Sequence, residues 1–163
     1  MKDSYYVGAY WGPRLETPSE CARRVVHFLE LLAPCDPAFV QWYRGGRGAP
    51  RGSAGHPLQV EVAAVEALLK KKRGRAGQGN KDVTHLGFGQ HFWNAKEDPA
   101  FISLSCGSLS RWGPSNSCII HPPMYRPLMQ QPVTVTAFSA ALLSVVVAWD
   151  PDFAMVSTTE LSD

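Results

Sequence analysis

The sequence predicts an α+β fold in which a mostly antiparallel sheet packs against two to three helices within a single domain, residues 1–163. Three stretches support this prediction. Residues 5–32 have the pattern of a strand, a turn and an amphipathic helix, residues 87–108 that of two strands joined by a turn, and residues 132–149 that of an apolar helix. A chain of 163 residues, 45% of them hydrophobic, is long enough to bury roughly 70% of its unfolded surface.

The first unit has the clearest local signals. Residues 5–11 (YYVGAYW) are aromatic or small and apolar, as in a half-buried strand, and Gly12-Pro13 ends the run. Thr17 is suited to be the N-cap of a helix, with Pro18 at its first position and Glu20 placed to accept a hydrogen bond from the Thr17 amide. At about 100° per residue, residues 18–32 separate into an apolar face and a charged face. We therefore expect an amphipathic helix here.

The middle of the chain contains a loop and a second helix. Residues 44–56 (RGGRGAPRGSAGH) are rich in glycine and arginine without apolar periodicity, which predicts a flexible surface loop. Residues 58–73 have an apolar stripe, acidic residues near the start and Lys70-Lys-Lys-Arg73 at the end. That charge order complements the helix dipole and gives the basic residues an ordinary structural explanation.

Four further strands and a third helix complete the prediction. Strands are expected at residues 87–94, 101–108 and 117–121, and another begins at Phe153. Residues 132–149 are apolar nearly all round, which predicts a helix at the centre of the domain. The pattern Asp-Pro-x-Phe occurs at residues 36, 98 and 150, where it predicts turns. Tyr10, Trp11 and Trp93 are expected to join the first strand to the sheet in the core; the alternative is a hot spot for a partner.

Charge is unevenly distributed along the chain. Residues 44–81 contain nine Lys or Arg against Glu61 and Glu66, a net charge of +7, whereas the four charges after Arg126 are all negative. The basic stretch, with Trp42 and Tyr43 nearby for stacking, allows an alternative function as a small nucleic-acid-binding protein. Against that alternative, the overall charge is only +2 and no known reading motif is present.

The motifs of several enzyme classes are missing. Residues 74–81 superficially resemble a phosphate loop, but Asp82 replaces the required hydroxyl and a helix, not a strand, precedes the segment. His85, His91 and His121 could approach Cys106 and Cys118, yet no pair has zinc-ligand spacing. Cys21 and Cys35 likewise fit reduced thiols. Asp150 and Asp152 fit a helix cap and a solvated acid better than a catalytic pair. We therefore predict no enzyme activity, cofactor or metal.

A family resemblance follows from motifs spread over the whole chain. The sequence resembles the immunity protein 52 family of bacterial polymorphic toxin systems through these motifs in order: Tyr10-Trp-Gly-Pro-Arg14-x-Glu16, Cys21-Ala22-x-Arg24, Phe28-Leu29, Asp36-Pro-x-Phe39, Trp42-Tyr43, Phe92-Trp93-Asn94, Cys106-Gly107, Asn116-Ser117 and Trp149-Asp-Pro-x-Phe153-Ala154. Members of that family continue into further strands and a terminal helix, so the resemblance implies a chain shortened at its C-terminus.

The resemblance implies a cytoplasmic antitoxin without catalytic activity. Its partner would be a nuclease toxin of restriction-endonuclease-like fold, often delivered by type VI secretion, with no membrane and no direct nucleic-acid contact. Two surfaces are candidates for toxin binding. The acidic one, suited to a basic nuclease cleft, comprises Asp150, Asp152, Glu160 and Asp163. The other is an exposed aromatic and basic region comprising Trp42, Tyr43, Arg44 and Arg47.

Overall fold

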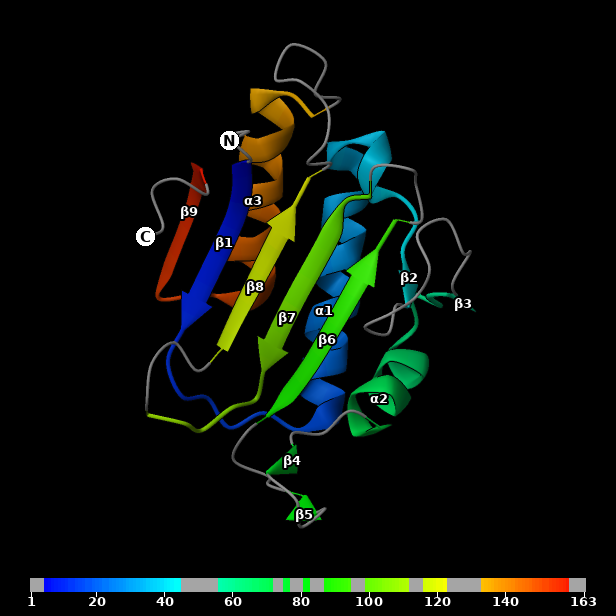
Figure 1. The fold of residues 1–163 in the computed structure, drawn as a ribbon, viewed down its shortest axis with the longest axis vertical. Coiled ribbons are helices and arrows are strands. Elements are labelled where there is room, and N and C mark those ends of the chain that lie inside the picture. The colour runs from blue at the N-terminus through cyan, green and yellow to red at the C-terminus, as the bar shows by residue number, and fades with distance from the viewer. Residues whose placement is uncertain are drawn as a thin grey trace.

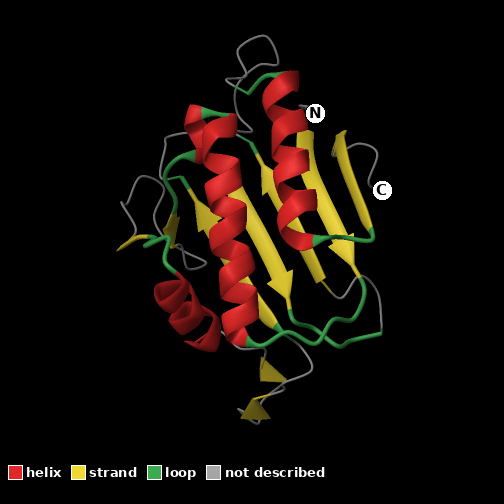
Figure 2. Cartoon of the chain, turned by 180° about the vertical axis from the view of Figure 1, so that it is seen from behind, coloured by secondary structure: helices red, strands yellow, loops and turns green. Residues whose placement is uncertain are grey.

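A computed structural model describes residues 5–44, 56–71, 75–76, 81–82, 87–94, 99–111, 116–122 and 133–158. These residues form an α+β fold: a seven-stranded antiparallel sheet with its three α-helices on one face (Figures 1 and 2). The predicted fold class is confirmed. The domain limits, residues 1–163, stay a prediction.

The elements follow one another along the chain as β1 (Tyr5–Trp11), α1 (Pro18–Leu32), two 3-10 turns, η1 (Ala33–Cys35) and η2 (Pro37–Phe39), then β2 (Tyr43–Arg44), β3 (His56–Pro57), α2 (Val62–Lys71), β4 (Arg75–Ala76), β5 (Lys81–Asp82), β6 (Phe88–Trp93), β7 (Phe101–Cys106), β8 (Asn116–His121), α3 (Val135–Trp149) and β9 (Phe153–Thr158). Strands β4 and β5 pair with each other apart from the main sheet.

Strand order in the main sheet is β3-β2-β6-β7-β8-β1-β9. The first strand of the chain therefore lies between the last two, with Val7 opposite Ile120 of β8 on one side and Val156 of β9 on the other. Strands β6, β7 and β8 form a meander of neighbours, as expected from their alternating sequences. Strands β8 and β9, which come late in the chain, thus flank β1 on both sides. Local sequence signals do not predict this position of β1.

The core lies between the sheet and the helices. Side chains at alternate positions of the strands point to this side, including Val7, Trp11, Ile102 and Ile120, each at most 2% exposed. The apolar face of α1 covers them with Phe28 and five other buried residues: Cys21, Ala22, Val25, Leu29 and Leu32. The periodicity of α1 therefore predicted correctly which side of the helix faces the sheet.

The start of α1 is confirmed in detail. The Thr17 hydroxyl accepts from the Glu20 amide at 3.2 Å, and the Glu20 carboxylate accepts from the Thr17 amide at 2.8 Å. These two bonds form the predicted capping box, with Pro18 at the first helical position. The backbone bond from Thr17 lowers the pKa of Glu20. Two donors without helical partners are thus satisfied within four residues of sequence.

The position predicted for the third helix is wrong. Helix α3 packs against α1, β1 and β9, but its opposite side faces solvent, and Val135, Leu143 and Val147 are 83%, 64% and 62% exposed. A helix that is apolar all round is expected inside a protein. In the described part of the chain only one layer of helices exists, so nothing there covers the outer side of α3. An uncharged helix surface is left exposed.

Other predictions differ at element boundaries or lie outside the described residues. Helix α2 begins at Val62, four residues later than expected, and Lys72 and Arg73 are not described. The loop predicted at residues 44–56 and the turn at Asp98 also fall largely outside the described residues. The turn at Asp36 is confirmed, because its carboxylate accepts from the Ala38 amide at 2.7 Å. No described helix has the length and apolar character needed to cross a membrane.

Candidate partner-binding surfaces

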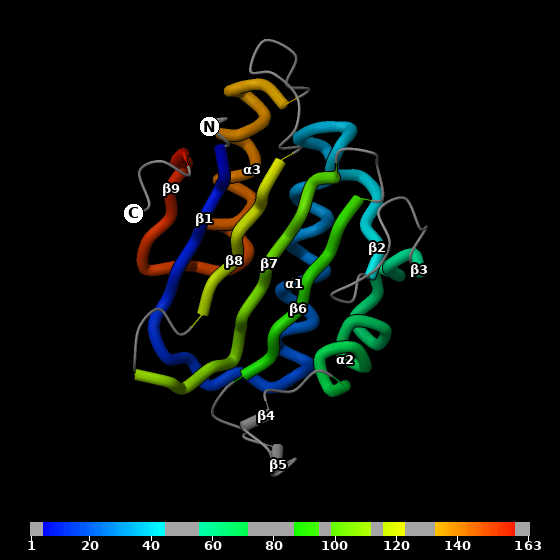
Figure 3. Tube along the Cα trace, viewed as in Figure 1, coloured from blue at the N-terminus to red at the C-terminus, as the bar shows by residue number. Residues whose placement is uncertain are grey.

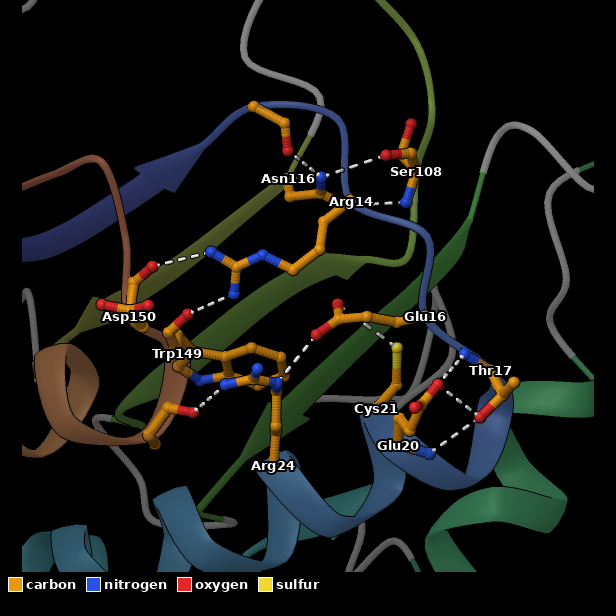
Figure 4. Close-up of polar contacts among 12 residues, drawn as sticks. Arg14, Glu16, Thr17, Glu20, Cys21, Arg24, Ser108, Asn116, Trp149 and Asp150 are labelled. Atoms are coloured by element: carbon orange, nitrogen blue, oxygen red, sulfur yellow. Dashed lines mark hydrogen bonds and ion pairs between the residues drawn. The ribbon is translucent and has the colours of Figure 1, made fainter.

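Two arginines from the beginning of the chain hold the C-terminal end of α3. Arg14 donates to the carbonyl oxygens of Trp149 and Asp150, both at 2.7 Å, and Arg24 of α1 donates to that of Ala148 at 2.9 Å (Figure 4). The last carbonyls of a helix lack helical partners and carry partial negative charge. A guanidinium group donates hydrogen bonds to these carbonyls and also carries a positive charge that offsets their partial negative charge. The position of α3 therefore depends on side chains more than a hundred residues away in the sequence.

The turn after α3 is fixed from several directions. Asp150 is the C-cap residue in the left-handed conformation, with φ of 47°, which Asp adopts more readily than most residues. The Asp152 carboxylate accepts from the Gly12 amide at 2.7 Å. Asp152 therefore ties the turn to the end of β1, which is a structural role. The side chain of Asp150 is exposed.

Residues 12–17 form an irregular but well-anchored loop. Asn116, which is fully buried, donates to the carbonyl of Gly12 at 2.7 Å and to that of Ser108 at 3.2 Å. The Arg14 amide donates to Ser108 O at 3.0 Å. Buried polar side chains with full partners specify one backbone arrangement. The loop is thus held by contacts to β8 and to the residues that follow β7.

Glu16 is the one acidic residue in this network that is buried. It is 8% exposed, forms an ion pair with Arg24 (Oε1 to Nε, 2.7 Å), and its other oxygen lies 3.9 Å from the Cys21 sulfur. Arg24 therefore neutralises a buried carboxylate and caps α3 at the same time. A depression of about 350 Å³ opens beside this pair, lined by Arg14, Leu15, Glu16, Glu20, Arg23 and Arg24.

The aromatic residues do not form the cluster expected from the sequence. Trp11 stacks on Trp149 with ring centroids 5.1 Å apart in the core beside Arg14. Tyr10 points to the other face of the sheet, and Trp93 lies in β6, two strands away from β8, with Tyr43 against its ring edge. The prediction of a core role is right for Trp11, which is 2% exposed, but its predicted partners are wrong. Strand register, which places Trp11 and Trp93 at different ends, is the reason.

The helix-free face of the sheet carries a row of rings across four strands. His91 stacks on Phe101 at 5.4 Å, Phe101 lies 6.0 Å from His121, and His121 lies 5.9 Å from Tyr6. Burial lowers the pKa of His121. Of these pairs only His91 and Phe101 are stacked; the other two are tilted, so the row is a set of side-by-side packed rings and not a continuous stack.

The histidines and cysteines do not assemble into a metal site among the described residues, where no group of three or more suitable ligands occurs. His85 lies outside them. All four cysteines are free, and three are fully buried. Burial raises the pKa of Cys118, while a side-chain hydrogen bond with Cys21, followed by burial, raises that of Cys106. These two thiols are small core residues and poor nucleophiles.

The acidic candidate surface is only partly described. Asp150 and Asp152 lie in one turn, whereas Glu160 and Asp163 fall outside the described residues. Arg14 and Arg24 approach the same turn, so the surface around Asp150 carries both signs of charge. The sequence excess of negative charge after residue 126 therefore does not become a purely acidic face here.

The second candidate surface is corrected in one respect. Trp42 was expected to be exposed, but it is 2% exposed, stacks on Phe39 and donates to the Phe39 carbonyl at 2.9 Å. Tyr43 is half-buried and Arg44 is exposed on β2. Arg47 lies outside the described residues. Arg44 lines a depression of about 360 Å³ together with His56, Pro57, Leu58, Gln59, Ala64, Ala67, Leu68 and Lys71.

Comparison with known proteins identifies the family. A model of the family described as immunity protein 52 matches residues 3–163. The chain belongs to the immunity protein 52 family. A search of curated proteins gave no match. As an immunity protein, the chain functions by binding a toxin partner.

Several of the motifs that carried the resemblance meet near the C-terminal end of α3 in this immunity protein. Arg14, Glu16 and Arg24 near the start of the chain meet Trp149 at the end of α3, and Asn116 of β8 holds the Gly12 backbone beside them (Figure 4). The sequence singled them out as a pattern but gave no role to any of them. A short-range signal could not have done so, because the contacts that join the start of the chain to β8 and to the end of α3 span 104 to 136 positions.

Proposed function

We propose that this immunity protein protects its host cell by binding and neutralising a secreted nuclease toxin of restriction-endonuclease-like fold. The observation that carries the proposal is the family match over residues 3–163. Neutralisation acts through a complementary surface and requires no chemistry, cofactor or metal in the immunity protein. The complex forms in the cytoplasm, where a nuclease delivered by type VI secretion would reach DNA.

The anchored turn at residues 150–152 supports the acidic placement of the interface. A surface that is already fixed before binding loses less conformational entropy on association. Arg14 and the Asp152 contact to Gly12 fix the backbone of the turn, and the exposed carboxylate of Asp150 lies at its tip. We propose that Asp150 faces the basic DNA-binding cleft of the toxin and that Asp152 positions it.

Coexpression tests the function. The protein is expressed with the toxin encoded beside it, and plasmid integrity is followed after toxin induction. We expect intact plasmid with the immunity protein and degraded plasmid without it. A copurified complex should form at the same time. Degradation that proceeds equally in both cultures, with both proteins folded, would remove this function.

Charge removal tests the placement. Asp150→Asn keeps the shape and tolerates the left-handed backbone, so it changes charge with little strain. We expect slower association with the toxin at low salt and a smaller difference at high salt, because exposed charges are screened. Glu30→Gln, an exposed charge removal on α1, is the matched control. Equal association rates for both variants would favour the surface at Tyr43 and Arg44 instead.

The nucleic-acid alternative has its own test. Filter binding of labelled single-stranded DNA and RNA over a salt series measures how many phosphates the protein neutralises. We expect affinity no better than millimolar even at low salt. Micromolar binding with a steep salt dependence would establish the alternative, with Arg44 and Lys71 at the edge of the 360 Å³ depression as the first residues to substitute.

A further inference from the structure

The helix-free face of the main sheet, the nearer side in Figure 3, carries aromatic rings in register across the strands. Cross-strand pairing joins four of these residues, in the order Tyr43, Trp93, Phe101 and His121. Tyr6 of β1 continues the row, with its ring centroid 5.9 Å from that of His121. The next residue, Val7, is 1% exposed in the core, so Tyr6 points away from the helices. One aromatic row therefore crosses five strands, from β2 to β1.

Within the described strands β1, β6, β7 and β8, no outward position is charged. Besides the rings, these positions hold small or aliphatic side chains: Gly8, Gly89, Ser103, Ser105, Ser117 and Ile119. Burial lowers the pKa of His121, which keeps its ring neutral at pH 7. The solvated face of an antiparallel sheet is ordinarily polar, whereas the centre of a protein interface is depleted in charge and rich in aromatic residues. The composition of this face is that of an interface.

The residue types on the face favour a protein as the occupant. Nucleic-acid binding needs Lys or Arg beside the rings to contact phosphates, and the outward positions of these four strands have none. Tyr and Trp dominate the binding energy of protein interfaces, and Tyr10, Tyr43 and Trp93 are all outward and half-buried. The exposed apolar residues of α3 are Val and Leu, which are under-represented among such hot spots. The sheet face is therefore the better protein-binding surface of the two.

We propose that the toxin binds across this face, with an apolar patch of its own against the rings of Tyr43, Trp93 and His91. The inference rests on the proposed function, because it takes the toxin as the partner, and it adds the centre of the interface to the contact proposed for Asp150. Asp150 lies three residues before Phe153, the register partner of Tyr10, and thus at the border of the face. Rings at the centre and charge at the border are the usual arrangement in protein interfaces.

The face has the size and rigidity that a stable complex needs. Its four central strands have six or seven residues each. Spaced about 4.8 Å apart and about 20 Å long, they span roughly 400 Å² in projection. Strands β2 and β9 and the relief of the side chains add to this area, which approaches the roughly 800 Å² per partner of a standard interface. The strands are already paired, so binding orders few further groups.

Affinity for the toxin encoded beside the protein is the first test. Ser103 is half-buried at the centre of the face, opposite His91 on one side and Ile119 on the other. Ser103→Lys adds length and charge there, and its flexible stem can reach solvent, so the fold should persist. We expect binding weaker by roughly tenfold or more, mainly through faster dissociation, whereas Asp150→Asn mainly slows association. Thr136→Lys, at an exposed position of α3, is the matched control and should stay within about twofold of the unsubstituted protein.

Hydroxyl-radical footprinting of the unsubstituted protein is a second measurement, which does not depend on the folding of a variant. The toxin should reduce the oxidation of Tyr43 and Trp93 and leave that of Leu143, which is 64% exposed on α3, unchanged. Protection of Leu143 without protection of Trp93 would overturn the proposal. So would a folded Ser103→Lys variant that binds the toxin as tightly as Thr136→Lys does. In both cases the proposed function would stand, provided that the plasmid stays intact on coexpression.

Other occupants of the face give different results. Micromolar binding of single-stranded DNA that Ser103→Glu weakens would assign the face to nucleic acid, and a dimer of the free chain that Ser103→Lys dissociates would assign it to a second copy. Slow oxidation of Trp93 in the free protein, with a much lower urea midpoint for Ser103→Lys, would show that a segment of this chain covers the face. Each result would overturn the assignment to the toxin. Unsubstituted protein that neither binds the toxin nor protects the plasmid would remove the proposed function as well.

Discussion

Arginine 14 is expected to be worth about 2 kcal/mol to the stability of the fold. Its guanidinium makes two hydrogen bonds of 2.7 Å at the C-terminal end of α3, one part-buried and one exposed. A hydrogen bond to a charged group contributes about 1.5–3 kcal/mol when shielded and less in water, and a cation at a helix C-terminus adds about 0.3–1 kcal/mol. We take the lower part of that sum because the site is partly open to solvent.

The variant Arg14→Ala therefore tests how α3 is held. Urea unfolding followed by far-ultraviolet circular dichroism should show a loss of about 2 kcal/mol, with a melting temperature lower by roughly 4–8 °C and an unchanged m value. Arg14→Lys keeps the charge but cannot bridge two carbonyls, so about half the loss should remain.

Arg23→Ala is the matched control. Arg23 lies on the same end of the molecule and is exposed, with a long 3.4 Å hydrogen bond to Ser19 and electrostatic interactions with Glu20 and Glu66. Arg23→Ala should lower the free energy of unfolding by no more than about 0.5 kcal/mol. If Arg14→Ala were no more costly than Arg23→Ala, the carbonyls at the end of α3 would be equally well satisfied by water. The claim that distant arginines position this helix would then be wrong.

Three further predictions concern the buried polar and titratable groups. Glu16→Ala should lower the free energy of unfolding by about 2–3 kcal/mol, because it leaves the Arg24 guanidinium beside a buried site without its anion. In a double-mutant cycle, replacing Glu16 and Arg24 together by leucine should recover part of that stability. A thiol reagent should label half-buried Cys35 quickly in the native protein and the other three cysteines only after unfolding; fast labelling of four thiols would contradict their burial. Because burial lowers the pKa of His121 in the folded state, the unfolded state binds more protons, so stability should fall as pH drops below about 6.5. His121→Gln should flatten this decline, measured as the urea midpoint against pH, and an unchanged slope would assign it to other groups.

Local sequence signals predicted the local structure well. The capping box of Thr17 and Glu20, the amphipathic pattern of α1 and the alternation in β7 each depend on residues within a few positions, and all three are confirmed. The turn at Asp36 follows the same rule. The errors concern exposure. Trp42 and the outer side of α3 were assigned to the wrong environment, because burial depends on what packs against a segment and not on its own composition.

In the candidate site, too, the local position of a residue was predictable from the sequence and its contacts were not. The sequence identified Asp150 and Asp152 as acids in a turn after a helix, and that is where they lie. Their different roles, one exposed and one bonded to Gly12, were not predictable, because the contact spans 140 residues. Arg14, Glu16 and Arg24 were recognised only as parts of a motif. Their meeting at the end of α3 depends on the insertion of β1 between β8 and β9.

By itself, the sequence determined the fold class, the family and the start of α1, since each rests on patterns that the chain carries in short segments or in their order. Only the tertiary structure decided which acid of the turn is bonded to Gly12, which is exposed, and which of the described apolar side chains face solvent. The physical reason is that charge pairing and burial are set by distances through space: Trp42 is buried by Phe39, and one side of α3 is exposed among the residues that the structure describes.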